Sequence, residues 1–227
     1  MAALAGLWHK RNCSWVNPPH GASRAANRLW QLRLAQSVGL RIPDTVVTND
    51  PDEAQRFIAE HRAGVILKDL DTPFAVIRSR PLVSFTRTIN ALDHDRLQAV
   101  ALAPCLFQER IPKHHEVRAY VIGDRILAAG VASAEDDRTL EDYRRRRYQV
   151  KIWPYTLSSD VVERCQELVA ATGLKYAGID LIVTPDGDTV FLELGPYSSW
   201  VWVQEQGGIP LTSAFTDLLT TLTDNDG

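Results

Sequence analysis

The feature that most constrains the fold is a β-hairpin predicted near the C-terminal end of the sequence. Two apolar, β-prone runs, GIDLIVT and TVFLEL, flank the turn-forming residues Pro185-Asp186-Gly187-Asp188, a pattern typical of two antiparallel strands joined by a tight loop. If Thr184 pairs with Thr189, the register places Asp180 directly opposite Glu193. Opposed side chains have Cβ atoms about 4.5–5.5 Å apart, and two like charges at that distance repel each other.

The two carboxylates therefore need a partner or access to water. Their neighbours along the strands are apolar: Ile179, Leu181, Leu192 and Leu194. A hard divalent cation between the carboxylates would make the pairing favourable, and Mg²⁺ is commonly held by one or two carboxylates plus substrate phosphates. Alternatively, the two carboxylates belong to the exposed polar face of a half-buried hairpin and do not pair, because a register slip of one residue would remove the pairing. The hairpin alone is compatible with a Mg²⁺ site and with an exposed polar face.

The other elements define the fold class. The segment EVRAYVIGDRILAAGV has a two-residue Gly123-Asp124 turn between apolar runs and predicts another hairpin. We expect helices over residues 22–38, from Pro51 to about His61, from Ser158 or Ser159 to Gly173 and over 211–222, with strands at 42–48, 64–68 and 105–110. Because most neighbouring strands are joined as hairpins, the pattern predicts an α+β fold with antiparallel sheets in two lobes rather than a doubly wound sheet.

Composition excludes several classes of protein. The 227 residues carry a net charge of −3, so no strongly basic surface indicates nucleic acid binding. There is no run of about 18 apolar residues, so no membrane span is expected. The three cysteines are far apart, which suits neither a disulfide framework nor a zinc site and predicts a reducing, cytoplasmic location.

Two cations are candidate binding residues. Lys68 ends the apolar run Val65–Leu67, where it either reaches nucleotide phosphates or marks the solvated end of a strand. Arg118 lies within a strand and needs an anionic partner, either a ligand or a structural carboxylate. The run Arg144–Arg147 is either a solvated face or a contact for an acidic peptide or phosphate. The sequence contains no GxxxxGK[ST], GxGxxG or GxSxG motif.

The order of these segments resembles the ATP-grasp superfamily. The segments that carry the resemblance are, in chain order, GLRIPDTVVTNDPDEAQRF, VILK, FQERIPKHHEVRAYVIGDRILAA and GIDLIVTPDGDTVFLELGP. More narrowly, the sequence looks like the graspetide, or microviridin-type, ligases that mature ribosomal peptides. The resemblance implies ATP- and Mg²⁺-dependent ligation of a peptide carboxylate to an amine or hydroxyl through an acyl phosphate. The expected partner is a ribosomal precursor peptide or a small carboxylate substrate, and a homodimer stays open.

The resemblance also assigns roles to residues. It implies that Lys68 contacts phosphate and that Arg118 steadies the transferred phosphoryl group. It also implies that Asp180 and Glu193 bind Mg²⁺. The implied adenine-binding hinge consists of Gln108, Glu109, Arg110 and Ile111. Asp142-Tyr143-Arg144 resembles an Asp-Trp-Arg segment of these maturases, which would bring the basic loop beside the substrate. We expect residues 69–95 to form irregular strands and a mobile lid. The implied lobes span residues 41–111 and 112–227, after a leading segment over 1–40.

Three departures from the family pattern stand out. Gly195 occupies the position of an asparagine that is usually a metal ligand, and Arg28 replaces a frequent lysine. A leading domain of roughly a hundred residues would normally come first, and we expect residues 1–19 to be the remnant of its last helix. Two rival functions therefore stay open. One is an ATP-grasp ligase for an amino acid or small peptide, and the other is a degenerate domain that binds without turnover.

Overall fold

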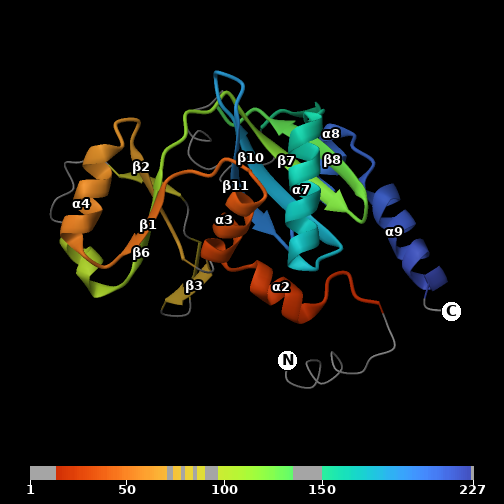
Figure 1. Cartoon of the computed structure of the whole chain (residues 1–227), viewed down its shortest axis with the longest axis horizontal. Coiled ribbons are helices and arrows are strands. Elements are labelled where there is room, and N and C mark those ends of the chain that lie inside the picture. Colours follow the sequence, from red (N-terminus) through yellow and green to blue (C-terminus); the bar gives the residue numbers. More distant parts are fainter. Residues whose placement is uncertain are drawn as a thin grey trace.

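The computed structural model describes residues 14–70, 74–77, 80–83, 86–89, 97–134 and 150–225. Two antiparallel sheets dominate the fold and lie side by side in Figure 1, each with its own helices. The predicted α+β class is confirmed. The first thirteen residues, the tripeptide Asp142–Arg144 and the run Arg144–Arg147 lie outside the described residues, as do parts of the expected lid.

The smaller sheet has the strand order β1-β6-β2-β5. Its strands are β1 (Thr45–Thr48), β6 (Cys105–Glu109), β2 (Val65–Lys68) and β5 (Arg87–Ile89). Helix α4 (Pro51–Glu60) begins where the sequence predicts, because the Asp50 side chain accepts a hydrogen bond from the Asp52 N–H at 2.9 Å. The helix, the sheet and the short 3₁₀ helix η1 (Gln98–Leu102) enclose a core that includes Ala54, Val65 and Phe107.

The expected lid segment contains strands among its described residues. A separate two-stranded ribbon consists of β3 (Phe74–Ile77) and β4 (Arg80–Val83), and β5 follows it to join the smaller sheet. The prediction of strands in this segment is confirmed for the described residues, whereas their irregularity and the role of lid stay predictions.

The larger sheet has the strand order β11-β10-β7-β8-β9. Its strands are β11 (Thr189–Gly195), β10 (Tyr176–Val183), β7 (His115–Ile122), β8 (Arg125–Val131) and β9 (Ile152–Tyr155). The predicted turn at Gly123-Asp124 is confirmed, and Gly123 has a φ of 62°, which favours glycine at this place.

Helices cover both faces of the larger sheet. Helices α2 (Pro19–Ala25), α3 (Arg28–Ser37) and α7 (Ser159–Thr172) pack against the face formed by Val117, Ala119, Ile179 and Leu181. Helices α8 (Val201–Gly207) and α9 (Leu211–Asn225) cover one end of the opposite face, where Tyr120 and Tyr176 are buried. Arg118 and Asp180 are two and four residues along their strands from Tyr120 and Tyr176, so they lie on this opposite face, beyond the part that α8 and α9 cover.

The single helix predicted over residues 22–38 is wrong. Helix α2 ends at Ala25, and Asn27 begins α3 by accepting a hydrogen bond from the Trp30 N–H at 3.0 Å. Asparagine is a preferred residue at a helix start, because its short side chain binds backbone N–H groups that have no partner in the first turn. The break turns α3 so that Gln31, Leu32 and Ala35 are all buried.

The predicted opposition of Asp180 and Glu193 is confirmed, although through a different register. At the turn, Thr189 pairs with Val183 and not with Thr184, so this part of the predicted register is wrong by one residue. The ladder then shifts between Asp180 and Leu181, because β11 contains a bulge at Leu192, and the shift restores the predicted pair.

The bulge has a packing reason. Residues i and i+2 of a regular strand share a face, so Phe191 and Glu193 would point the same way without it. Phe191 is fully buried in the core beneath α3 and α7, whereas Glu193 faces Asp180 on the other side of the sheet. The extra residue lets one strand serve both the core and the candidate site.

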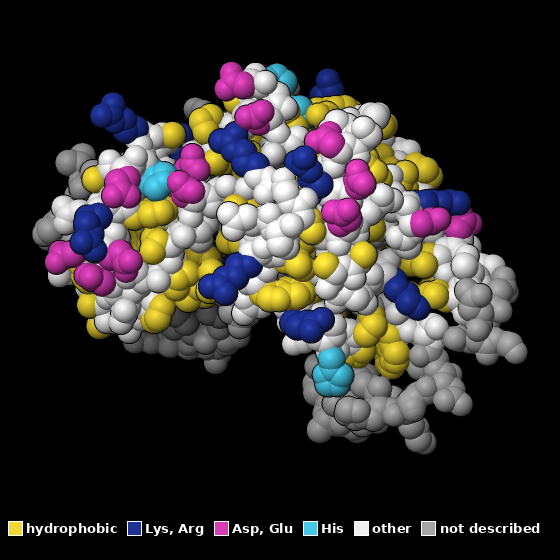
Figure 2. Space-filling view, in the orientation of Figure 1, with side chains coloured by type: hydrophobic (Ala, Val, Ile, Leu, Met, Phe, Trp, Pro, Cys, Tyr) yellow, Lys and Arg dark blue, Asp and Glu magenta, His cyan; other side chains and the backbone are white. Residues whose placement is uncertain are grey.

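The surface agrees with the even charge balance. Figure 2 shows Lys and Arg side chains interspersed with Asp and Glu over one face of the molecule. Among the described residues, no helix has the length and apolar character needed to cross a membrane.

Candidate functional site

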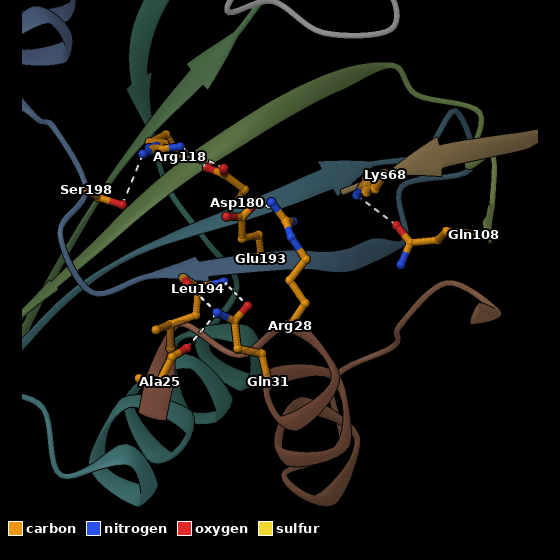
Figure 3. A network of polar contacts seen from close by, with 10 residues as sticks. All are labelled: Ala25, Arg28, Gln31, Lys68, Gln108, Arg118, Asp180, Glu193, Leu194 and Ser198. Carbon is orange, nitrogen blue, oxygen red and sulfur yellow. Dashed lines mark hydrogen bonds and ion pairs between the residues drawn. The ribbon is translucent and has the colours of Figure 1, made fainter. Parts of the chain in front are cut away.

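The candidate site begins with three charged residues on neighbouring strands of the larger sheet. Asp180 on β10 is the direct partner of Arg118 on β7 and of Glu193 on β11. Directly paired residues project from the same face of a sheet. The register therefore brings one cation and two carboxylates together, as Figure 3 shows.

Arg118 and Asp180 form a close ion pair. The Arg118 Nη1 donates to both carboxylate oxygens of Asp180, at 2.5 and 2.7 Å. The Arg118 Nη2 donates to the Ser198 hydroxyl at 3.1 Å. The structural carboxylate that the sequence analysis left open for Arg118 is thus Asp180, and its role toward an anionic ligand stays a prediction.

Glu193 has an arginine from another part of the chain. Arg28, the first residue of α3, donates from Nη1 to Glu193 Oε2 at 3.0 Å. The two opposed carboxylates are therefore each bound to a different guanidinium, which offsets their mutual repulsion. Burial raises the pKa of the Asp180 carboxyl, the Arg118 guanidinium opposes this rise, and the carboxylates of Glu193 and Glu116 add to it.

The donor set fits a magnesium ion held jointly with phosphate. Among the residues that the structure describes, no group of three or more His, Cys, Asp and Glu side chains is placed to hold a metal. One or two carboxylates are nevertheless the usual protein contribution to a Mg²⁺ site whose remaining ligands are phosphate oxygens and water. The residues Asp180 and Glu193 match that pattern, and Gly195 adds no side-chain oxygen.

Lys68 lies on the smaller sheet, at the side that faces this cluster in Figure 3. Its Nζ donates to Gln108 Oε1 at 2.8 Å, and Gln108 Nε2 donates to Thr45 Oγ1 at 2.9 Å. Gln108 is buried, with 2% of its surface exposed. The lysine is therefore held by a buried amide and is not merely at the solvated end of a strand.

The predicted hinge leaves β6 and runs toward the larger sheet. The Glu109 N–H donates to the Asp44 carbonyl at 2.8 Å, and the Arg110 N–H donates to the Gly64 carbonyl at 2.9 Å. Ile111 is buried against Ile182 and Val190 of the larger sheet. The structure thus places the four residues 108–111 at the junction of the two sheets, and their contact with adenine stays a prediction.

A second charged pair lies on the same face and was not predicted from the sequence. Glu116 precedes Arg118 by two residues on β7 and therefore shares its face. The Lys113 Nζ donates to Glu116 Oε1 at 2.5 Å, and the Ser133 hydroxyl donates to the same oxygen at 2.9 Å. The period-two alternation of the strand was the available signal, whereas nothing in the sequence indicated Ser133.

Gln31 was also missed, and it holds the outer edge of β11. Its Nε2 donates to the carbonyls of Ala25 at 2.6 Å and Leu194 at 2.7 Å, and its Oε1 accepts from the Leu194 N–H at 3.0 Å. The Arg41 carbonyl accepts from the Phe191 N–H at 2.8 Å farther along the same edge. A helix side chain and a short parallel bridge therefore take the place of another strand beside Glu193.

The model of the RimK-like ATP-grasp domain matches residues 25–213 of the chain. This match covers both sheets and every charged residue of the cluster. The chain belongs to this family. The ATP-grasp assignment agrees with the α+β fold, which contains two antiparallel sheets.

Solved structures of similar proteins include a RiPP-associated ATP-grasp ligase and a macrocyclase. A RiPP-associated ATP-grasp ligase of Chryseobacterium gregarium, solved with ADP and with a leader and core peptide, has a TM-score of 0.88 and 26% identity over 96% of this chain and 66% of that chain. The macrocyclase MdnB of Microcystis aeruginosa MRC has a TM-score of 0.75 and 30% identity over 96% of this chain and 67% of that chain.

The name of one curated relative indicates that it acts on a small molecule. The tetrahydromethanopterin:alpha-L-glutamate ligase of Methanocaldococcus jannaschii is 25% identical over 192 residues, which are 82% of this chain and 63% of that protein. The ATP-grasp domain described here thus spans about two thirds of the length of these relatives.

Proposed function

We propose that the chain is an ATP- and Mg²⁺-dependent carboxylate ligase that forms ester or amide cross-links in a ribosomal precursor peptide. The observation that carries this proposal is the cluster of Arg118, Asp180 and Glu193, with Lys68 facing it from the other sheet. The likeness to the peptide-bound ligase of Chryseobacterium gregarium supports the choice of substrate class.

In the proposed reaction, a side-chain carboxylate oxygen of the peptide attacks the terminal phosphorus of ATP. An acyl phosphate forms on the peptide, and ADP is the leaving group. An amine or hydroxyl of the same peptide then attacks the acyl phosphate, loses its proton and releases phosphate. Transfer of this kind depends mainly on positioning and charge neutralisation, so lysine, arginine and a metal ion suffice.

The residues of the chain have distinct proposed roles. Lys68 and Arg118 bind the phosphates, and Gln108, Glu109, Arg110 and Ile111 bind adenine. Asp180 and Glu193 hold Mg²⁺, which neutralises phosphate charge when it is bound. Arg28 keeps Glu193 directed toward Asp180. The proposed lobes are residues 41–111 and 112–227, which contain the smaller and the larger sheet.

The test is a reaction with ATP, Mg²⁺ and a candidate precursor peptide whose gene lies next to the gene for this chain. We expect the peptide to lose the mass of one water molecule for each cross-link formed, as measured by mass spectrometry. The variant Glu193→Gln should leave the peptide unmodified, and ATP should be required. An unchanged peptide mass with normal nucleotide binding would contradict the proposal.

Two other functions have specific support. Similarity to the glutamate ligase of Methanocaldococcus jannaschii supports ligation of an amino acid or small peptide, which would appear as ADP release with free glutamate and no peptide. Gly195, in place of a usual metal ligand, supports a domain that binds nucleotide without turnover. Release of ADP in the presence of the precursor peptide but not of free amino acids separates the first proposal from both.

A further inference from the structure

Two glycines make room for one serine beside the charged cluster. Gly178 on β10 and Gly195 on β11 are direct partners in the ladder. A Cβ atom on Gly195 would lie 2.2 Å from the Ser198 hydroxyl, and a Cβ atom on Gly178 would lie 2.5 Å from the same atom. Atoms that are not bonded do not approach so closely, so a side chain at residue 195 requires the Ser198 hydroxyl to leave this position.

The turn that carries Ser198 is held from several sides. The Tyr176 hydroxyl donates to the Ser198 carbonyl, and the Tyr120 hydroxyl donates to the Ser199 carbonyl at 3.1 Å. Asn17 Nδ2 donates to the Pro196 carbonyl at 2.9 Å. Because these groups come from the sheet and from the segment before α2, a side chain at residue 195 could not simply push the turn aside.

Ser198 also acts on the central arginine. Its hydroxyl accepts from Arg118 Nη2, while Arg118 Nη1 donates to the carboxylate of Asp180. Figure 3 shows the guanidinium lying between these two acceptors. A planar guanidinium with an acceptor on each terminal nitrogen is fixed in both position and orientation.

We propose that residues 195 and 198 form a mutually exclusive pair, and that Ser198 is a positioning residue for Arg118. The Ser198 hydroxyl occupies the space that a side chain at residue 195 would need, and it binds Arg118 and not Mg²⁺. The role of Ser198 toward ligand rests on the proposed function, because it requires Arg118 to contact the terminal phosphoryl group. The absence of a side chain at residue 195 is then a rearrangement of the site and not a sign of its decay.

The positioning role is tested by nucleotide binding in the presence of Mg²⁺. We expect Ser198→Ala to weaken binding of a non-hydrolysable ATP analogue about three- to tenfold, which is the range expected for the net loss of one ordinary hydrogen bond. Binding of ADP, which lacks the terminal phosphoryl group, should change less than twofold. Ser198→Thr, which keeps the hydroxyl, should bind the analogue as the unaltered chain does.

Ser199→Ala is the matched control. Ser199 is the next residue of the same turn, its side chain is exposed, and its contacts to Tyr120 and Trp202 use the backbone carbonyl, which the substitution keeps. Its affinities for both nucleotides should match those of the unaltered chain. Equal effects of Ser198→Ala and Ser199→Ala, or equal weakening of both nucleotides by Ser198→Ala, would overturn the positioning role.

The exclusion of one residue by the other is tested by urea unfolding without any ligand. We expect Gly195→Asn alone to lower the unfolding midpoint, because the new side chain meets Ser198. Ser198→Gly should lower the midpoint in the unaltered chain but raise it in the Gly195→Asn background. A shift of the same sign and size in both backgrounds would overturn the mutually exclusive pair.

The two tests separate the inference from the proposed function. If the unaltered chain binds neither nucleotide, the proposed function is wrong and the role of Ser198 toward ligand falls with it. The opposite shifts in unfolding midpoint need no nucleotide, so they still decide whether residues 195 and 198 exclude each other.

Discussion

Asp180 and Glu193 lie directly opposite each other on adjacent antiparallel strands, and each accepts a hydrogen bond from a different arginine. Arg118 comes from the neighbouring strand β7, and Arg28 comes from helix α3. The two guanidinium groups each bind one carboxylate, so a Mg²⁺ ion at this place would share the carboxylates with Arg118 and Arg28.

The first prediction concerns the metal. Glu193→Gln removes one of the two opposed negative charges and should weaken binding of ADP in the presence of Mg²⁺ by at least about tenfold. Binding measured by calorimetry in EDTA should be unchanged or slightly stronger, because the phosphates lose a repulsive neighbour. Glu163→Gln, an exposed change on α7, serves as the control. Equal loss with and without Mg²⁺ would show that Glu193 does not act through the metal.

The second prediction concerns Lys68. Lys68→Met removes a cation that faces the cluster and should weaken ADP binding about tenfold. The effect should shrink as salt is added, because screening already weakens the interaction in the unaltered chain. Lys151→Met changes an exposed lysine and should leave binding as it is. If both variants bind ADP equally well, Lys68 serves only to hold Gln108.

The third prediction concerns the edge of β11. Gln31→Ala removes three hydrogen bonds and leaves the buried N–H and carbonyl of Leu194 without their partner. We expect a loss of about 2–4 kcal/mol in the free energy of unfolding, measured with urea. Gln36→Ala on the same helix is exposed and should cost less than about 0.5 kcal/mol. Similar losses for the two variants would contradict the role of Gln31.

The fourth prediction concerns pH. Burial lowers the pKa of His115, and the neighbouring His114 lowers it further, so this ring, which contacts Trp153 and Tyr155, takes up a proton less readily in the folded state. The unfolded state takes up a proton near the ordinary value of about 6.5. Stability should therefore be lost as the pH falls through that value. His115→Phe should reduce the loss of unfolding free energy between pH 8 and pH 5.

His61 should contribute to stability with the opposite pH dependence in the same experiment. A hydrogen bond to the Phe57 carbonyl and the nearby Asp44 carboxylate raise the pKa of His61, although burial opposes this. Its contribution is present below the unfolded value and is lost as the pH rises through the higher folded value. His61→Gln should therefore reduce stability more at pH 5 than at pH 8. Parallel profiles for the two histidine variants would contradict this account.

The hairpin shows how far the sequence could lead. Its two strands, its loop and the opposition of Asp180 and Glu193 were predictable from apolar patterning and turn residues. The register at the turn was not, because the bulge at Leu192 depends on the need of Phe191 for a place in the core. Packing between distant elements decides such a shift, and the residues of a single strand do not predict it.

Other features depended on contacts between distant segments. The break between α2 and α3 was readable in principle from Asn27, but the surrounding residues all favour helix. The short helix α8 and strand β9 were missed because both depend on contacts with other elements: β9 pairs with β8, and α8 packs against β9 and α9. The partnership of Arg28 with Glu193 joins residues 165 positions apart and is set by the fold alone.

The closed edge of β11 limits how a substrate can reach the carboxylates. An exposed strand edge would accept an extended peptide as one more strand and would read it mainly through its backbone. Beside Glu193, however, Gln31 and Arg41 already occupy the backbone groups of Leu194 and Phe191. A substrate must therefore approach from above the sheet, where it meets side chains, and selectivity at this site would rest on the chemistry of the incoming side chain.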